Sequence, residues 1–148
     1  MTSFKPNVGD VILNKYECIS LVGEGAFGCV YRARDIKLGR IVAIKFINAA
    51  NGVLKRFSDE LDAIKNLDHP NIVRLYDYDI LKGGVPCMVM EFVNGLELGE
   101  ILSKEGPFDL TRICDIALQV LDALVETHNH EIIHCDLKPE NIMLTSVG

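Results

Sequence analysis

The apolar residues of this chain change their spacing part-way along the sequence. Before Asn94-Gly95 they mostly form short runs rich in β-branched and aromatic residues, which is typical of strands. After this point they recur every three or four positions, as on one face of a helix. A chain whose strands come first and whose helices follow is typical of an α+β unit joined to the beginning of a second one.

The pattern places each element within narrow limits. The expected strands are 16–22, 29–33, 41–47, 72–76 and 86–93. One helix is expected from about Val53 to Pro70, where the proline ends it. Two more helices are expected at 96–102 and 110–128.

The charge balance excludes one large class of function. Fifteen Lys and Arg residues against 21 Asp and Glu residues give a net charge of -6, whereas binding to nucleic acid or anionic lipid needs a basic surface. We therefore expect no nucleic-acid partner. We also expect no membrane segment, because no apolar run approaches the ~18 residues that a spanning helix needs, and the N-terminus lacks a secretion signal. Five cysteines without a Cys-x-x-Cys pair are typical of reduced thiols in a cytoplasmic protein.

A glycine-rich stretch, Gly23-Glu24-Gly25-Ala26-Phe27-Gly28, joins the first two expected strands. Glycines let backbone N–H groups approach an anion closely because no Cβ intervenes. In a dinucleotide-binding fold a helix would follow these glycines directly, but here a strand follows. The order strand, glycines, strand predicts a hairpin whose tip covers phosphates as a flap. Turn glycines without any ligand are the alternative.

A lysine follows the apolar residues of the third expected strand, in Val42-Ala43-Ile44-Lys45. On the next helix, Glu60 shares the apolar face with Phe57 and Ile64, and a carboxylate there is costly unless it is paired. We expect Lys45 to be that partner, with its ammonium group also reaching the phosphates of a nucleotide. A lysine at a strand edge whose charge simply reaches solvent is the alternative.

The run His134-Cys135-Asp136-Leu137-Lys138-Pro139-Glu140-Asn141 brings three chemical groups into one loop. Asp136 supplies a carboxylate, Lys138 a cation and Asn141 an amide. Such a set can accept a hydroxyl proton, neutralise a transferring phosphoryl group and bind a magnesium ion. A solvated polar turn would explain the composition of this run but not its order, nor the glycines and the lysine that precede it.

Together these motifs resemble a eukaryotic-type Ser/Thr protein kinase domain, from its start through the catalytic loop. Gly23–Val30 is similar to the family's glycine-rich loop, and Val42–Lys45 to the strand that carries the ATP lysine. Glu60 falls where the family's regulatory helix has its glutamate, and His69–Val73 resembles the lead into the family's fourth strand. Asp136–Asn141 resembles the serine/threonine branch of the family rather than the tyrosine branch.

The resemblance implies a role for each part of the site. Asp136 would be the catalytic base, Lys138 would act on the transferring phosphoryl group, and Asn141 would bind the metal. The residues implied to bind ATP are Val22, Gly23, Glu24, Gly25, Ala26, Phe27, Gly28, Val30, Ala43, Lys45, Glu60, Met90, Glu91, Val93 and Met143. Among these, Glu91 and Val93 would offer backbone groups to the adenine edge. The implied cofactors are ATP and Mg²⁺.

The resemblance also implies the fold. It is an α+β, protein-kinase-like fold with a five-stranded antiparallel N-lobe and one main helix, followed by the first helices and the catalytic loop of the C-lobe. We expect an N-terminal lead over 1–15, the N-lobe over 16–93 and a partial C-lobe over 94–148. Because no Asp-Phe-Gly motif follows the catalytic loop, we interpret the chain as a domain truncated before that motif.

The implied reaction transfers the γ-phosphoryl group of ATP to a Ser or Thr hydroxyl of a protein substrate, and we expect the truncated chain to be inactive, or nearly so, by itself. A non-catalytic nucleotide-binding or regulatory kinase fragment is one alternative, and a small nucleotide-binding fold unrelated to kinases is another. We expect the helix at 110–128 to expose apolar surface that a further partner could cover.

Two residues next to the proposed base are expected to be structural. His134 is expected to be a packed histidine and Cys135 a small buried thiol. Many family members have arginine in place of Cys135, and that arginine usually meets a phosphate on the activation segment. This mode of control is therefore not expected here.

Overall fold

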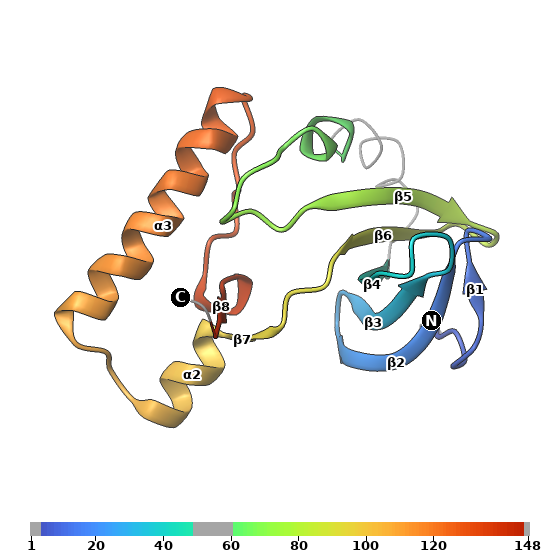
Figure 1. Cartoon of the computed structure of the whole chain (residues 1–148), viewed down its shortest axis with the longest axis horizontal. Helices are drawn as coiled ribbons and strands as arrows, with labels where there is room; N and C mark the ends of the chain where they lie inside the picture. The colour runs from blue at the N-terminus through green and yellow to red at the C-terminus, as the bar shows by residue number, and fades with distance from the viewer. Residues whose placement is uncertain (1–3, 49–60, 147–148) are drawn as a thin grey trace. The chain divides into compact units, whose positions relative to one another are not determined.

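The computed structural model describes residues 4–48 and 61–146, and the chain divides into two compact units (Figure 1). Unit 1 comprises Met1–Asn66 and Arg74–Phe92, and unit 2 comprises Leu67–Val73 and Val93–Gly148. The short segment of unit 2 that precedes β5 therefore interrupts unit 1 in the sequence. The most N-terminal part of the predicted helix and its residue Glu60 lie outside the described residues, while residues 61–65 are helical.

Unit 1 is built on one antiparallel sheet (Figure 1). Its six strands within the described ranges are β1 (Val11–Ile12), β2 (Tyr16–Gly25), β3 (Gly28–Asp35), β4 (Ile41–Ile47), β5 (Leu75–Leu81) and β6 (Val85–Glu91). They lie in the order β1-β2-β3-β4-β6-β5, so β4 is a central strand and β5 an edge strand. The predicted antiparallel sheet is confirmed, with one more strand than the five expected.

The side chains of β4 separate a core face from an open face. Val42, Ile44 and Phe46 are fully buried and pack in one cluster with residues of β2, β3 and β6. Because side chains alternate along a strand, Ala43 and Lys45 point to the opposite face. The β-branched run that predicted this strand thus supplies the core on one side only.

Side-chain bonds link the edge strand β5 to the start of β2 on the other side of the sheet. Asp77 of β5 accepts a hydrogen bond from the Tyr16 hydroxyl of β2 at 3.3 Å and forms an ion pair with Lys15 at 3.4 Å. Burial, with the nearby Asp77 carboxylate, raises the pKa of Tyr16 to about 12. Since β3, β4 and β6 separate β2 from β5 in the strand order, these contacts require the sheet to curl.

Unit 2 contains two helices and a short strand pair. α2 (Leu98–Glu105) and α3 (Leu110–Asn129) are followed by the 3-10 helix η1 (Pro139–Asn141), and β7 (Gly95–Glu97) pairs with β8 (Met143–Thr145). Asp109 caps α3, because its Oδ1 accepts a hydrogen bond from the Arg112 N–H at 2.8 Å. A further backbone bond of 2.8 Å, from Leu98 N–H to Ile142 O, fixes α2 next to the chain that follows η1.

Two side chains anchor the segment Leu67–Val73 to α3. His69 Nε2 lies 3.1 Å from Asp122 Oδ2, and its Nδ1 accepts the Asn71 N–H at 3.1 Å. The Asn71 side chain donates to Gln119 Oε1 at 3.0 Å. These bonds explain why the prediction of a strand over 72–76 is wrong: its first residues belong to unit 2, and the strand begins at Leu75.

α3 exposes a long apolar face. None of its residues is buried, and Leu110, Leu118, Leu121 and Val125 are each more than half exposed. The expected exposure of apolar surface on this helix is therefore confirmed. Within the described ranges, no helix combines the length and the apolar character that crossing a membrane requires.

Candidate functional site

The glycine-rich stretch forms the tip of the β2–β3 hairpin (Figure 1). The two strands pair as far as Gly25 opposite Gly28, with Gly23 opposite Val30. The predicted hairpin is therefore confirmed, and its strands extend into the glycines themselves. Ala26 and Phe27 form the turn, where the Phe27 side chain is 78% exposed.

The glycines of the hairpin differ in what the fold demands of them. Gly28 has φ +137°, and a Cβ atom there would lie 1.9 Å from the backbone oxygen of Phe46. Only glycine fits this position, because β4 passes too close. At Gly23 and Gly25 a Cβ would meet nothing within 4 Å. The space above these two glycines fits the approach of an anion to backbone N–H groups.

Four of the residues implied to bind ATP share the open face of the sheet. Val30 is the cross-strand partner of Lys45, and Ala43 is the partner of Met90. Ala43 and Lys45 are two residues apart on β4, so all four side chains point to the face opposite the core. This arrangement places apolar side chains next to one ammonium group. The predicted partner of Lys45, Glu60, lies outside the described residues.

Glu91 ends β6, and both its backbone and its side chain form hydrogen bonds with the backbone of Arg74. Its N–H donates to the Arg74 carbonyl at 2.8 Å, and its Oε2 accepts the Arg74 N–H at 3.3 Å. Because the N–H is used within the chain, an adenine bound here would need the Glu91 carbonyl oxygen. Val93 belongs to unit 2, as do Met143 and the loop that contains Asp136.

The loop that contains Asp136 gathers the three groups singled out from the sequence. Lys138 Nζ lies 3.2 Å from Asp136 Oδ2. The Asn141 side-chain amide donates to the same Oδ2 at 3.2 Å and to the Asp136 carbonyl at 2.7 Å. The hydrogen bond from Lys138, followed by that from Asn141, lowers the pKa of Asp136 below its ordinary value. The carboxylate is thus ionised at neutral pH.

The backbone turns sharply just before Asp136. Cys135 has φ +62°, and the Asp136 N–H donates to the His134 carbonyl at 2.9 Å. A bond between residues two apart with positive φ at the centre is the strained form of γ-turn. His134 and Cys135 are both exposed, so the predictions of a packed histidine and a buried thiol are wrong.

The arrangement of Asn141 suits a hard cation. Both hydrogen bonds from its side chain use the amide nitrogen, which leaves Oδ1 as an acceptor beside the Asp136 carboxylate. Oxygen ligands of this kind are those that Mg²⁺ prefers, and the ion in phosphoryl-transfer sites completes its shell with water and phosphate oxygens. The loop therefore offers one oxygen ligand to the implied metal, whereas the described residues contain no group of three or more His, Cys, Asp or Glu side chains that could hold an ion by themselves.

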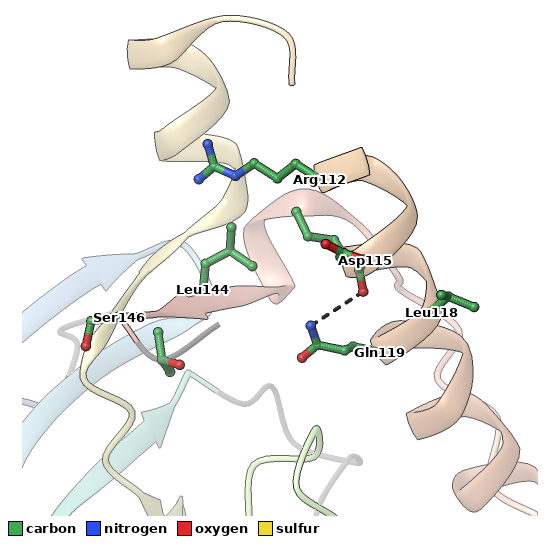
Figure 2. A pocket seen from close by; sticks show the side chains of 8 residues that line it. Arg112, Asp115, Leu118, Gln119, Leu144 and Ser146 are labelled. Carbon is green, nitrogen blue, oxygen red and sulfur yellow. Dashed lines mark hydrogen bonds between the residues drawn. The ribbon is translucent and has the colours of Figure 1, made fainter. Parts of the chain in front are cut away.

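Unit 2 also contains a pocket. It opens between α3 and β8, and Figure 2 shows the hydrogen bond from Gln119 Nε2 to the Asp115 carbonyl on its wall. Its lining residues are Arg112, Asp115, Ile116, Leu118, Gln119, Leu144, Thr145 and Ser146. None of the residues that the sequence implied as catalytic or ATP-binding lines it.

One contact at the glycine-rich hairpin was not predicted. Lys5 Nζ lies 2.8 Å from Glu24 Oε1, and the hydrogen bond to Glu24 raises the pKa of Lys5 above its ordinary value. No motif or spacing in the sequence connects the two residues, because the ion pair depends on where residues 4–10 pack.

The chain belongs to the protein kinase family, for which the glycine hairpin, the strand lysine and the loop with Asp136, Lys138 and Asn141 were expected as site residues. The family model of the protein kinase domain matches residues 16–148. Among characterised proteins, the chain is 39% identical over 141 residues to the serine/threonine-protein kinase pkn3 of Myxococcus xanthus. It is 34% identical over 145 residues to the serine/threonine-protein kinase PrkC of Bacillus subtilis.

The solved structures agree on the fold. A crystal structure of the PknI kinase domain of Mycobacterium tuberculosis matches with a TM-score of 0.88 at 23% identity, covering 97% of this chain and 60% of that one. The alignment with pkn3 covers 93% of this chain and 26% of the relative, and that with PrkC covers 95% and 22%. The chain thus spans about a quarter of the length of these relatives.

Proposed function

We propose that this chain is the nucleotide-binding and catalytic-loop part of an ATP-dependent Ser/Thr protein kinase. The observation that carries the proposal is the contact of both Lys138 and Asn141 with the carboxylate of Asp136. In a family whose relatives here are Ser/Thr kinases, this group serves the transfer of the ATP γ-phosphoryl group to a hydroxyl of a protein substrate.

Asp136 is the base in this proposal. Its lowered pKa keeps it as a carboxylate, which can accept the proton of the attacking Ser or Thr hydroxyl. The hydroxyl oxygen then bonds to the γ-phosphorus as the bond to the β–γ bridging oxygen breaks and ADP leaves. Lys138, 3.2 Å from Asp136, neutralises charge on the transferring group. Mg²⁺, when held at Asn141, supplies further neutralisation of phosphate charge.

Unit 1 supplies the binding of the nucleotide. The open glycines Gly23 and Gly25 let backbone N–H groups reach the phosphates, and Lys45 adds an ammonium group from the same face as its neighbours Val30 and Ala43. These apolar side chains would contact the purine ring. In this proposal residues 16–93 form the N-lobe of the family and residues 94–148 the first part of its C-lobe.

Nucleotide binding by the 148-residue chain is the first test. Titration with a fluorescent ATP analogue should show binding that Lys45→Met weakens about tenfold or more, as expected for loss of a charge-assisted phosphate contact. Lys37→Met removes the same charge from an exposed turn and is the matched control. Equal weakening by both variants would refute the role of Lys45, and no binding to the unaltered chain would refute a nucleotide site.

Phosphoryl transfer is the second test. We expect the 148-residue chain, which has no Asp-Phe-Gly motif, to transfer no radiolabelled phosphate to itself or to a generic basic protein. In a version extended to the full length of the family's domain, Asp136→Asn should abolish turnover but keep ATP binding. Near-normal turnover in that variant would refute the role of Asp136. Binding without turnover in the unaltered extended version would favour a regulatory fragment instead.

A further inference from the structure

Residues 4–10 run beside the glycine-rich hairpin, and one end of this segment is fixed to β2. The Gly9 N–H donates to the Cys18 carbonyl at 2.8 Å, and the Cys18 N–H donates to the Asp10 carbonyl at 2.9 Å. The Asn7 N–H also donates to Asp10 Oδ2 at 2.8 Å. These bonds lie well away from the glycines, close to the start of β2.

The other end of the segment contacts residues that lie beside the glycines. The Phe4 ring packs 5.2 Å from the ring of Phe46 in the core, and the Cys29 thiol donates to the Phe4 carbonyl at 3.4 Å. Lys5 Nζ forms its ion pair with Glu24 at 2.8 Å. Glu24 and Cys29 are cross-strand partners, next to the pair formed by Gly25 and Gly28. Residues 4 and 5 therefore hold both strands of the hairpin at one position.

We propose that Phe4–Asp10 is a strap that holds the glycine-rich hairpin, with Lys5 as a positioning residue for the cover over the phosphates. The strap spans the hairpin from Cys18 to Glu24, so it limits how far the tip can swing. Its effect on nucleotide binding rests on the proposed function, whereas its effect on the hairpin does not. The strap precedes residues 16–148, which the family model matches.

Charge gives Lys5 a second effect. Glu24 is the acidic residue within Gly23–Gly28, and its carboxylate would repel a triphosphate that approached the same backbone. The ammonium group of Lys5 neutralises it at 2.8 Å. Glu24 shares the core face of the sheet with its cross-strand partner Cys29, so the strap neutralises, from that face, a negative charge on the hairpin that would cover the phosphates.

An exposed ion pair alone contributes little, since ordering two long side chains offsets most of the attraction. Here the neighbouring contacts reduce that cost. Phe46 and Cys29 are each 1% exposed, so Phe4 is docked on a rigid core, and Pro6 is buried as well. Lys5 is thus held near Glu24 by the backbone on both sides of it, and the pair needs little further ordering.

Hydrogen exchange in the 148-residue chain without nucleotide tests the strap directly. Lys5→Glu and Glu24→Lys should each speed amide exchange across residues 23–28 about two- to fivefold, because each single change places like charges together. The double variant restores the pair with reversed charges and should return the rate to that of the unaltered chain. Lys37→Glu carries the same charge change in an exposed turn and should leave these amides unchanged.

Unchanged exchange in the single variants, or no recovery in the double variant, would overturn the proposal. Phe4→Ala, which removes the aromatic anchor but no charge, should also speed exchange at residues 23–28, and protection equal to the unaltered chain would count against the strap. With nucleotide added, Lys5→Glu should weaken ATP binding about two- to fivefold and leave adenosine binding unchanged, since adenosine has no phosphates. Equal effects on both ligands would overturn the electrostatic part.

The two proposals fail in different ways. If the exchange results hold but no nucleotide binds, the strap stands and the kinase function of the chain falls. If ATP binds and Lys45→Met weakens this binding, but amide exchange at residues 23–28 does not change in the Lys5 and Glu24 variants, the proposed function is supported and the strap is refuted.

Discussion

Replacing Gly28 by alanine should destabilise unit 1 by about 2 to 5 kcal/mol. The new Cβ would lie 1.9 Å from the Phe46 oxygen and 2.9 Å from its carbonyl carbon. The distance to the oxygen is about 1.5 Å shorter than the shortest ordinary van der Waals contact. Both atoms are backbone of the central strand β4, which cannot move away without breaking its pairing with β3. Holding alanine at φ +137° adds backbone strain.

Gly25→Ala is the matched control for this prediction. Its Cβ would meet nothing within 4 Å, and its φ is not positive. Its stability should therefore stay within about 0.5 kcal/mol of the unaltered chain or rise slightly, because alanine has less freedom in the unfolded state. Urea unfolding, followed by circular dichroism, measures the stability of both variants. The stability lost in Gly28→Ala would be a large share of the free energy of unfolding of about 5–15 kcal/mol that is typical of a domain.

Nucleotide titration separates the two glycines a second time. Gly25→Ala should weaken ATP binding although the fold is intact, because the methyl group occupies the space that the phosphates need. Equal unfolding midpoints for the two variants would refute the reasoning about Gly28. Unchanged ATP affinity in Gly25→Ala would refute the reasoning about the open glycines.

Two further predictions concern stability. His69→Ala should lower the free energy of unfolding by about 1 to 2 kcal/mol, because it removes the side chain that joins the segment Leu67–Val73 to α3. The same change at the exposed His128 is the control. Equal urea midpoints for the two variants would contradict the prediction. Burial raises the pKa of Cys18 and of Cys87 to about 11, and that of Tyr16 to about 12. The unfolded chain therefore loses these protons first, and stability should fall between about pH 9 and 12, by about 2 kcal/mol per thiol at about pH 10.5. A constant urea midpoint from pH 8 to pH 11 would contradict this.

Elements set by local pattern could be predicted closely from the sequence. β4 has the predicted bounds, Ile41–Ile47, because a β-branched run between two turns leaves little choice. α3 begins at Leu110 as predicted and ends one residue later than expected, with its N-terminus fixed by the Asp109 side chain. In both cases the residues that determine the element lie within it or next to it.

The prediction for β5 has the wrong bounds because a polar residue of this strand binds side chains that are distant in the sequence. Asp77 and Asp79 interrupt the apolar pattern, so the run at 72–76 looked more like a strand than Leu75–Leu81 does. Yet Asp77 is the carboxylate that Tyr16 and Lys15 bind. A polar residue paired across 61 positions cannot be distinguished from a turn residue by periodicity alone.

The candidate site shows the same contrast. Asp136, Lys138 and Asn141 lie within one loop, so the sequence alone indicates that their side chains can meet, and the structure places them within hydrogen-bond distance. Lys5 and Glu24 meet only because Phe4 packs on Phe46, which is distant in the sequence. Such a contact depends on tertiary packing, so no local sequence pattern predicts it.

The strongest indication of a ligand comes from residues that the fold does not require. Gly28 is explained fully by the closeness of β4, so it carries no information about a nucleotide. Gly23 and Gly25 have neither a close neighbour nor a positive φ, and glycine there lowers stability by increasing the freedom of the unfolded chain. Lys45 likewise lies on the face opposite the core. Residues that weaken or do not serve the fold, yet lie on one hairpin and one sheet face, support the phosphate-bearing ligand of the proposed function.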